Sequence, residues 1–219
     1  MKPVIVCVAT EPRFQKNMER LKASLVEHWP YDSMLFTDWP KPVRIQSYTQ
    51  SEMPYQFKVA AIQQAIEAGY SQIIWLDSVM QMLKNPFPLL EKSESGLVFF
   101  HNLGHPLKNY ICDEAVKLLL IEEYELDDYE QVWGGAFMID LNKENADLFF
   151  DDLKDYSLNG SFKNGGSSRH GFVAHRHDQA VMSVLSKDYE ATLLPYGYIV
   201  SKEHLSTGEY GKENYILYS

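Results

Sequence analysis

Hydrophobic residues occur along the chain in two patterns: short continuous runs, and longer segments with an apolar residue at every third or fourth position. Residues 4–9 and 73–76 form runs of the first kind, and both contain β-branched side chains. Such runs are typical of strands buried on both faces of a mostly parallel sheet. The second run stops at Asp77. We therefore expect a carboxylate at the carboxyl end of a buried strand, where open α/β sheets bind their ligands.

The second pattern predicts amphipathic helices between the strands. One helix is expected to begin at Pro12, and others are expected at residues 55–68, 114–123 and 142–156. A further helix is opened by residues 175–179. Additional strands are indicated at residues 34–37, 96–101, 132–140 and 193–200. Together these elements favour an α/β domain built on a mostly parallel sheet.

Size and cysteine usage narrow the class of protein. The 219 residues contain no Pro-, Gly- or Ser-rich linker, so we expect one domain over residues 1–219, which could be the N-terminal part of a longer polypeptide. Cys7 and Cys112 lack metal-ligand spacing and are interpreted as free thiols in a reducing compartment. We find neither a signal peptide nor a run long enough to span a membrane. These features predict a cytoplasmic location.

The charge balance and the loop after the first strand exclude several functions. A formal net charge of -10 with no basic cluster argues against nucleic acid as a partner. A small nucleotide is still compatible, because backbone amides and a metal ion can hold phosphates. The loop at residues 9–13 has neither a G-x-G-x-x-G nor a G-x-x-x-x-G-K-[ST] motif. Dinucleotide-binding folds and the common ATPases and GTPases are therefore excluded.

Four residues are candidates for a ligand site, and each also has a purely structural interpretation: Lys58, Asp77, Gly134 and Gly135. The Asp77 carboxylate could take part in ligand binding or catalysis, or it could only cap the following turn. Lys58 stands in the first turn of a helix, where a cation opposes the helix dipole, so it either holds a carboxylate or phosphate or is a solvated surface residue. Gly134 and Gly135 interrupt an apolar run, which indicates close approach of a ligand or a simple bulge.

A dense polar cluster, His175-Arg-His-Asp-Gln179, opens the helix that follows a long glycine-containing loop at residues 157–174. The loop is long enough to be a lid or a binding loop, or else a disordered insertion. The cluster matches no standard zinc motif. Its alternative is a helix start capped by Asp178, with His175 and His177 on the surface.

The order of these segments resembles the GT-A fold of nucleotide-sugar glycosyltransferases over nearly the whole chain. The likeness is carried by a strand–helix start without a Gly-rich phosphate loop, the Lys58 helix, the Trp75-Leu-Asp-Ser78 strand end, the Trp133-Gly-Gly-Ala-Phe137 segment and the His175–Gln179 cluster. Size and motif order are also similar to small glycosyltransferase domains of large algal viruses and bacterial polysaccharide loci. The resemblance implies a single domain with a mixed, mostly parallel central sheet flanked by helices.

The resemblance also implies a metal site. In the family, a D-x-D motif after a buried strand binds the divalent cation that bridges the donor phosphates, and Asp77 matches its first aspartate. The sequence departs from the motif at Val79, where the second aspartate is expected. Either a Mn²⁺ or Mg²⁺ ion is then held by Asp77, the donor diphosphate, waters and a distant histidine, or the use of metal is weak. His175, His177 and His204 are the candidates, of which His177 is preferred.

The remaining site residues follow from the same resemblance. By analogy Ala9, Thr10 and Arg13 would cradle the nucleoside, usually uridine, and Lys58, Asp77 and Ser78 would contact the rest of the donor. Gly134 and Gly135 would lie against the transferred sugar. Asp178 and Gln179 would lie near the donor sugar and the acceptor, with Asp178 as the base of an inverting reaction or as an orienting group in a retaining one.

The expected activity is transfer of a hexose from a nucleoside-diphosphate sugar, uridine-linked by analogy, to a saccharide or glycoprotein acceptor. Two alternatives remain. A sugar nucleotidyltransferase would need a Gly-rich, basic loop after the first strand, which residues 9–13 do not provide. A catalytically inactive nucleotide-sugar-binding module would account for Val79. The oligomeric state is left open.

Overall fold

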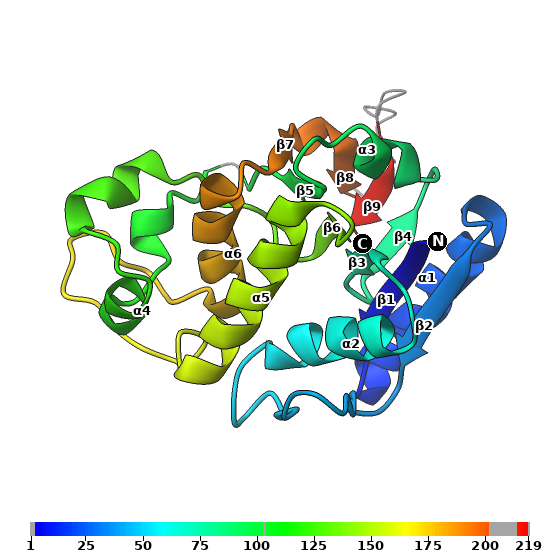
Figure 1. The fold of residues 1–219 in the computed structure, drawn as a ribbon, viewed down its shortest axis with the longest axis horizontal. Coiled ribbons are helices and arrows are strands. Elements are labelled where there is room, and N and C mark those ends of the chain that lie inside the picture. The colour runs from blue at the N-terminus through cyan, green and yellow to red at the C-terminus, as the bar shows by residue number, and fades with distance from the viewer. Residues whose placement is uncertain (1–2, 103, 202–213, 219) are drawn as a thin grey trace.

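A six-stranded sheet forms the centre of the computed structural model, which describes residues 3–102, 104–201 and 214–218 (Figure 1). Its strand order is β2–β1–β3–β6–β5–β7. The strands are β1 Pro3–Val8, β2 Asp32–Phe36, β3 Gln72–Leu76, β5 Leu97–Phe100, β6 Ala136–Asp140 and β7 Thr192–Leu194. Only β6 runs antiparallel to its neighbours in this sheet. The predicted α/β fold with a mixed, mostly parallel sheet is confirmed.

The neighbouring strands β1 and β3 contain continuous apolar runs because alternate side chains enter two different hydrophobic cores. One core receives Val4, Val6, Ile73 and Trp75, and the other receives Ile5, Cys7, Ile74 and Leu76. All eight side chains are fully buried. Both faces of the sheet are therefore covered, as the apolar runs predicted.

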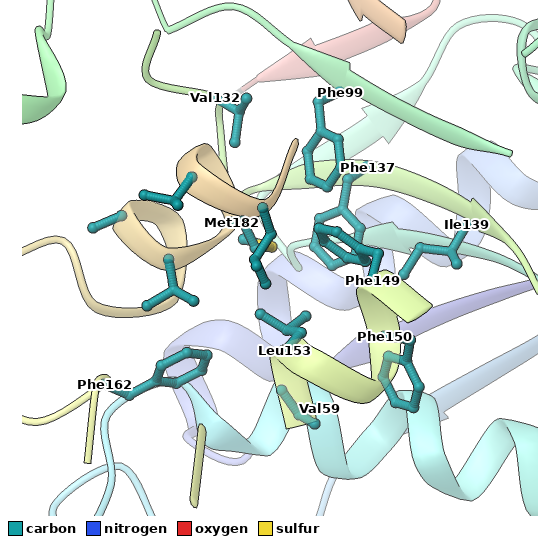
Figure 2. Close-up of a cluster of buried hydrophobic side chains, with 14 of the residues drawn as sticks. Val59, Phe99, Val132, Phe137, Ile139, Phe149, Phe150, Leu153, Phe162 and Met182 are labelled. Carbon is teal, nitrogen blue, oxygen red and sulfur yellow. The ribbon is translucent and has the colours of Figure 1, made fainter. Parts of the chain in front are cut away.

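The first core is covered by α2 Gln56–Glu67, α5 Glu144–Asn159, α6 His177–Asp188 and the short α4 Asp113–Leu118. Figure 2 shows its aromatic centre, where Phe137 of β6 lies beside Phe99 of β5 and Phe149 of α5. The ring centroids of Phe99 lie 5.5 Å from those of both Phe137 and Phe149. This packing holds α5 against the sheet. The buried residues Val181 and Met182 of α6 join the same core, which fixes the start of α6 at the sheet edge.

The second core lies on the other face, under α1 Pro12–His28 and α3 Phe87–Glu91. A small sheet closes it, with the strand order β4–β9–β8, formed by β4 Met80–Met82, β9 Ile216–Tyr218 and β8 Ile199–Ser201. Within the described ranges, three 3-10 helices complete the elements: η1 Leu107–Asn109, η2 Glu123–Asp128 and η3 Tyr196–Tyr198. Among the described residues, no helix has the length and apolar character needed to cross a membrane.

Three predicted elements differ from the structure. The predicted strand 132–140 begins only at Ala136, because the paired glycines form a turn before it. The predicted helix 114–123 ends at Leu118, since Leu120 adopts a left-handed backbone with φ 56°. The predicted strand 193–200 is divided into β7, η3 and β8 at Pro195, which has no N–H for a sheet ladder.

Candidate active site

Four segments distant in sequence meet at one edge of the sheet around the ammonium of Lys58. The edge is formed by the carboxyl ends of β1 and β3 and by the start of β6, which reaches it because β6 is antiparallel. The Nζ of Lys58 donates to the carbonyl oxygen of Gly134 at 2.7 Å. It lies 2.9 Å from Asp178 Oδ2 and 3.5 Å from Asp77 Oδ1. The structure therefore brings together Lys58, Asp77, Gly134 and Asp178 of the predicted set.

Lys58 is a buried cation held by two carboxylates. Lys58 and Asp178 are each 4% exposed. Burial by itself lowers the pKa of Lys58, but the charges of Asp178 and Asp77 outweigh it and hold that pKa above its usual value. Burial raises the pKa of Asp178 and the Asp77 charge adds to the effect, while Lys58 opposes it. The alternative of a solvated surface lysine is wrong.

Asp77 has contacts that a turn cap alone does not explain. The following turn is closed by backbone groups, with the Met80 N–H donating to the Asp77 carbonyl oxygen at 2.9 Å. The Asp77 side chain accepts a 2.8 Å hydrogen bond from Trp75 Nε1 at its Oδ1, the same oxygen that faces Lys58. The side chain is 35% exposed. Asp77 therefore joins the buried ion pair to the solvent-accessible part of the site.

The paired glycines let the backbone approach both carboxylates closely. A Cβ on Gly134 would lie 3.2 Å from Gln179 Cβ and 3.5 Å from Asp178 Oδ2, and one on Gly135 would lie 3.3 Å from Asp77 Oδ2. The Asp77 N–H donates to the Gly135 carbonyl oxygen at 2.8 Å. The glycines form a turn before β6, whose register with β3 is regular, so the backbone bends here without a β-bulge, and close approach of a ligand stays a prediction.

Asp178 and Gln179 face the same place from the first turn of α6. Asp178 does not cap this helix, because the N-cap is Arg176 and its side chain makes no cap hydrogen bond. Gln179 Oε1 accepts from the Gly134 N–H at 3.4 Å. Its Nε2 is buried and has no hydrogen-bond partner in the described part of the chain. An amide donor is thus left for a ligand oxygen beside the buried ion pair.

A pocket of about 290 Å³ opens next to Asp77, between the loop after β1 and the start of α2. It is close to the lower size limit of small-molecule sites, roughly 300 Å³. Four predicted donor residues line it: Thr10, Arg13, Asp77 and Ser78. Ala9 is not part of the lining; it is buried, and its N–H donates to the Phe36 carbonyl oxygen at 2.8 Å. Lys58 lies behind the pocket wall.

Sequence reasoning missed the aromatic walls of this pocket. They consist of Phe14, Trp39, Tyr55 and Phe57. The Lys58 Nζ lies 5.2 Å from the centroid of the Tyr55 ring and 5.4 Å from that of Trp75, so aromatic faces also surround the cation. The high aromatic content of the sequence was a signal for such stacking surfaces, but it did not identify these residues.

The structure distinguishes two of the three candidate histidines. His175 is buried, its Nε2 donates to the Ser161 carbonyl oxygen at 2.9 Å, and its Nδ1 accepts from the Cys112 N–H at 3.3 Å. Burial lowers the pKa of His175 to about 4. Both ring nitrogens are occupied, so His175 has a structural role. His204 lies outside the described residues.

His177 keeps one nitrogen for another partner. Its Nδ1 lies 3.0 Å from the Phe162 carbonyl oxygen, to which it must donate, and this leaves Nε2 as an acceptor. Its ring stacks on Tyr55 with centroids 5.5 Å apart, and both residues have a left-handed backbone, with φ 46° for His177 and 61° for Tyr55. The contact places His177 at the edge of the aromatic pocket wall.

The residues at the site offer one anchor for a divalent cation. Among the described residues, no group of three His, Cys, Asp or Glu side chains is placed to hold a metal ion. Asp77 Oδ1 is shared by Trp75 and Lys58, so Oδ2 is the oxygen left for a ligand. A hard dication can be bound by one or two carboxylates together with substrate phosphates and waters. Asp77 fits this minimal arrangement.

Comparison with solved structures identifies the architecture. A glycosyltransferase involved in glycosylation of the major capsid of the virus PBCV-1 matches 100% of this chain and 94% of its own length, with a TM-score of 0.58 and 11% identity. The apo structure of the bifunctional glycosyltransferase WbbM matches 99% of this chain, with a TM-score of 0.61 and 12% identity. The chain has a glycosyltransferase fold.

The likeness extends over the whole chain, but only at the level of the fold. The chain spans 45% of the length of the WbbM chain, so it corresponds to a part of that bifunctional protein. No protein-family model and no curated protein matches the sequence. The glycosyltransferase fold agrees with the resemblance found in the sequence, and it places the Lys58 cluster at the sheet edge where α/β proteins bind ligands.

Proposed function

We propose that this protein transfers a hexosyl group from a nucleoside-diphosphate sugar, uridine-linked, to a hydroxyl of a saccharide acceptor. One observation carries the proposal: Lys58, Asp77 and Asp178 converge at 2.9 Å and 3.5 Å beside an aromatic pocket. The aromatic walls suit stacking of a base, and the pocket opens toward Asp77. A sugar attached to the far end of the donor would then lie near Gly134 and Asp178.

The chemistry asked of these residues is a substitution at the anomeric carbon. The acceptor oxygen bonds to that carbon, the bond to the diphosphate breaks, and its electron pair leaves with the phosphate. In an inverting reaction Asp178 accepts the hydroxyl proton, for which its raised pKa makes it a stronger base. In a retaining reaction Asp178 and Gln179 orient the sugar instead.

A divalent cation, Mn²⁺ or Mg²⁺, belongs to the proposal. Asp77 Oδ2 would hold it together with donor oxygens, and His177 Nε2 is the proposed second protein ligand. When bound, such an ion neutralises the charge of the departing diphosphate. Lys58 holds Asp77 and Asp178 in place through its own charge, so the carboxylates keep their geometry before donor binding.

Hydrolysis of a panel of nucleotide sugars tests the proposal. We expect release of the nucleoside diphosphate from a uridine-linked donor, dependent on Mn²⁺ or Mg²⁺ and abolished by a chelator. Asp77→Asn and Asp178→Asn should each lower the rate by roughly 10²-fold or more. Asp155→Asn, an exposed carboxylate on α5, is the matched control and should keep the wild-type rate. Full turnover in both site variants would contradict the proposal.

A second candidate is a catalytically inactive nucleotide-sugar-binding module. It is favoured by Val79 in place of an acid and by the single carboxylate anchor of the site. Calorimetry with uridine diphosphate, with and without Mn²⁺, distinguishes the two: metal-dependent binding without turnover of any donor supports the module. Formation of pyrophosphate from uridine triphosphate and a sugar phosphate would instead support a nucleotidyltransferase.

A further inference from the structure

A second pocket at the same edge of the sheet is not used by the donor site. It has a volume of about 580 Å³ and lies where β5 and β7 end, at His101 and Pro195. Its other wall comes from the segment before β6 and from the end of η2, including Tyr129 and Gln131. The pocket is about twice as large as the aromatic donor pocket and is large enough for a sugar-sized ligand.

Gln131 gives this pocket an unused hydrogen-bond donor. The side chain is only 3% exposed, and its Oε1 accepts from Asn102 Nδ2 at 2.7 Å. The backbone reinforces this contact, since the Asn102 N–H donates to the Gln131 carbonyl oxygen at 2.8 Å. Gln131 Nε2 is buried without a partner in the described chain. An unpaired buried donor is costly, so its presence in a pocket wall indicates a ligand oxygen.

One continuous strip of backbone connects this pocket to the donor site. Gln131 is followed after three residues by Gly134, whose carbonyl oxygen binds Lys58. The strip is hydrogen-bonded to α6 at two points, because the Val132 N–H donates to Ser183 Oγ at 3.1 Å and the Gly134 N–H to Gln179 Oε1 at 3.4 Å. Three residues span at most about 11 Å. A ligand in the second pocket therefore lies within reach of the sugar expected at Gly134.

The charge of the pocket restricts what can bind. Its described lining includes the carboxylates of Asp127 and Glu130 and the imidazoles of His101 and His105, and no lysine or arginine. Glu130 Oε2 lies 2.6 Å from His101 Nδ1, and Asp127 Oδ1 lies 2.6 Å from the Nζ of Lys108. A negatively charged ligand would be repelled by the carboxylates of the pocket. A neutral ligand hydroxyl can instead form hydrogen bonds with the amide side chains of Asn102 and Gln131.

We propose that this pocket binds the acceptor, and that the acceptor is an uncharged saccharide whose hydroxyls meet Gln131 and Asn102. The inference rests on the proposed glycosyl transfer, since it supplies the second substrate of that reaction. It also states a selectivity: a sugar bearing a carboxylate is disfavoured by Asp127 and Glu130.

Ligand-observed NMR with methyl glucoside and methyl glucuronide tests the site. The two probes differ only in a carboxylate at C6, and we expect the glucoside to bind at millimolar concentration and the glucuronide at least fivefold more weakly. Gln131→Met should weaken glucoside binding about fivefold, the loss of one hydrogen bond. Asn102→Ala, at a less buried position, is a second variant in case Gln131→Met impairs folding. Glu130→Gln should narrow the difference between the probes.

Glu94→Gln is the matched control, an exposed glutamate that lines a cleft at the opposite edge of the sheet, and it should change nothing. Equal binding of the two probes, binding that the pocket variants leave unchanged, or no binding of the glucoside would each overturn the inference. Because NMR binding requires no turnover, these outcomes are distinct from a failure to hydrolyse any nucleotide sugar, which would count against the proposed function instead.

Discussion

Lys58 is the residue on which the geometry of the site depends. Its ammonium is the counter-charge of Asp178 and Asp77 and the donor to Gly134, so three of the four converging segments are held by one side chain. Buried ion pairs of this kind contribute little net stability compared with apolar packing, but they become strongly destabilising when one partner is removed. A buried lysine is therefore better explained by the placement of the carboxylates than by stability.

We predict that Lys58→Met destabilises the protein by roughly 3–5 kcal/mol, because Asp178 is left as an uncompensated buried charge. Urea unfolding measures this, and the double variant Lys58→Met/Asp178→Asn should recover a large part of the loss. Lys22→Met, at an exposed position of α1, is the control and should change stability by no more than about 0.5 kcal/mol. An unchanged unfolding midpoint in Lys58→Met would show that the pair is not maintained.

His175 predicts how stability depends on pH. Its pKa is about 4 in the folded protein, against the ordinary 6.5. Between these values the unfolded chain binds a proton that the folded chain does not, so stability falls as the pH drops from 6.5 toward 4, by at most about 1.4 kcal/mol per pH unit. In His175→Gln this contribution disappears. Urea unfolding between pH 4.5 and 7 should give a shallower acid slope for the variant, and parallel curves would contradict the prediction.

At the scale of elements, the site exists because β6 is antiparallel. A parallel β6 would place Gly134 and Gly135 at the opposite edge of the sheet, away from Asp77. Gly134 and Gly135 have a different role from Gly96, the residue directly before β5. Gly96 has a left-handed backbone with φ 76°, and a Cβ at this position would lie 2.8 Å from the Asp140 carbonyl oxygen. Gly96 is required by the backbone, whereas Gly135 is required by the neighbouring side chains.

Alanine substitutions should separate these two requirements. In Gly135→Ala the new Cβ meets the movable end of the Met80 side chain at 2.6 Å and Asp77 Oδ2 at 3.3 Å, so we expect a small loss of stability and a clear loss of donor hydrolysis. Gly96→Ala imposes a left-handed backbone on alanine, which costs at least about 1–2 kcal/mol, but its folded molecules should keep their activity. Thermal melts and activity per folded molecule measure both effects. The reverse ranking would contradict the assignment.

Sequence alone predicted the elements whose pattern is local. The apolar runs of β1 and β3, the start of α1 at Pro12 and the position of Asp77 at a strand end all depend on neighbouring residues. The direction of β6 could not be predicted in this way, because it depends on pairing with β3, which is distant in sequence. The burial of Lys58 could not be predicted either, because it depends on the distant residue Asp178. The same holds for His175, whose partners Ser161 and Cys112 come from other segments.

At the scale of the whole molecule, an acidic protein is proposed to bind an anionic donor. The formal net charge is -10, and the donor pocket does not reverse it locally, since its lining combines Arg13 with Glu11 and Asp77. Arg13 is moreover engaged with Glu11, with Nε 3.1 Å from Oε2. The long-range field therefore opposes approach of a diphosphate, so the proposed donor would depend on short-range contacts and on the proposed divalent cation.

This field predicts the effect of salt on the two substrates. At a fixed free concentration of Mg²⁺ or Mn²⁺, raising NaCl from low salt to 0.15 M shortens the screening length to about 8 Å and weakens the repulsion of the diphosphate. The KM for the nucleotide sugar should therefore fall over this range, while the KM for an uncharged acceptor should stay constant. Steady-state kinetics with each substrate varied in turn give both values. A donor KM that rises steeply with salt would mean that unpaired basic groups dominate donor binding, contrary to the charge distribution around Asp77 and Arg13.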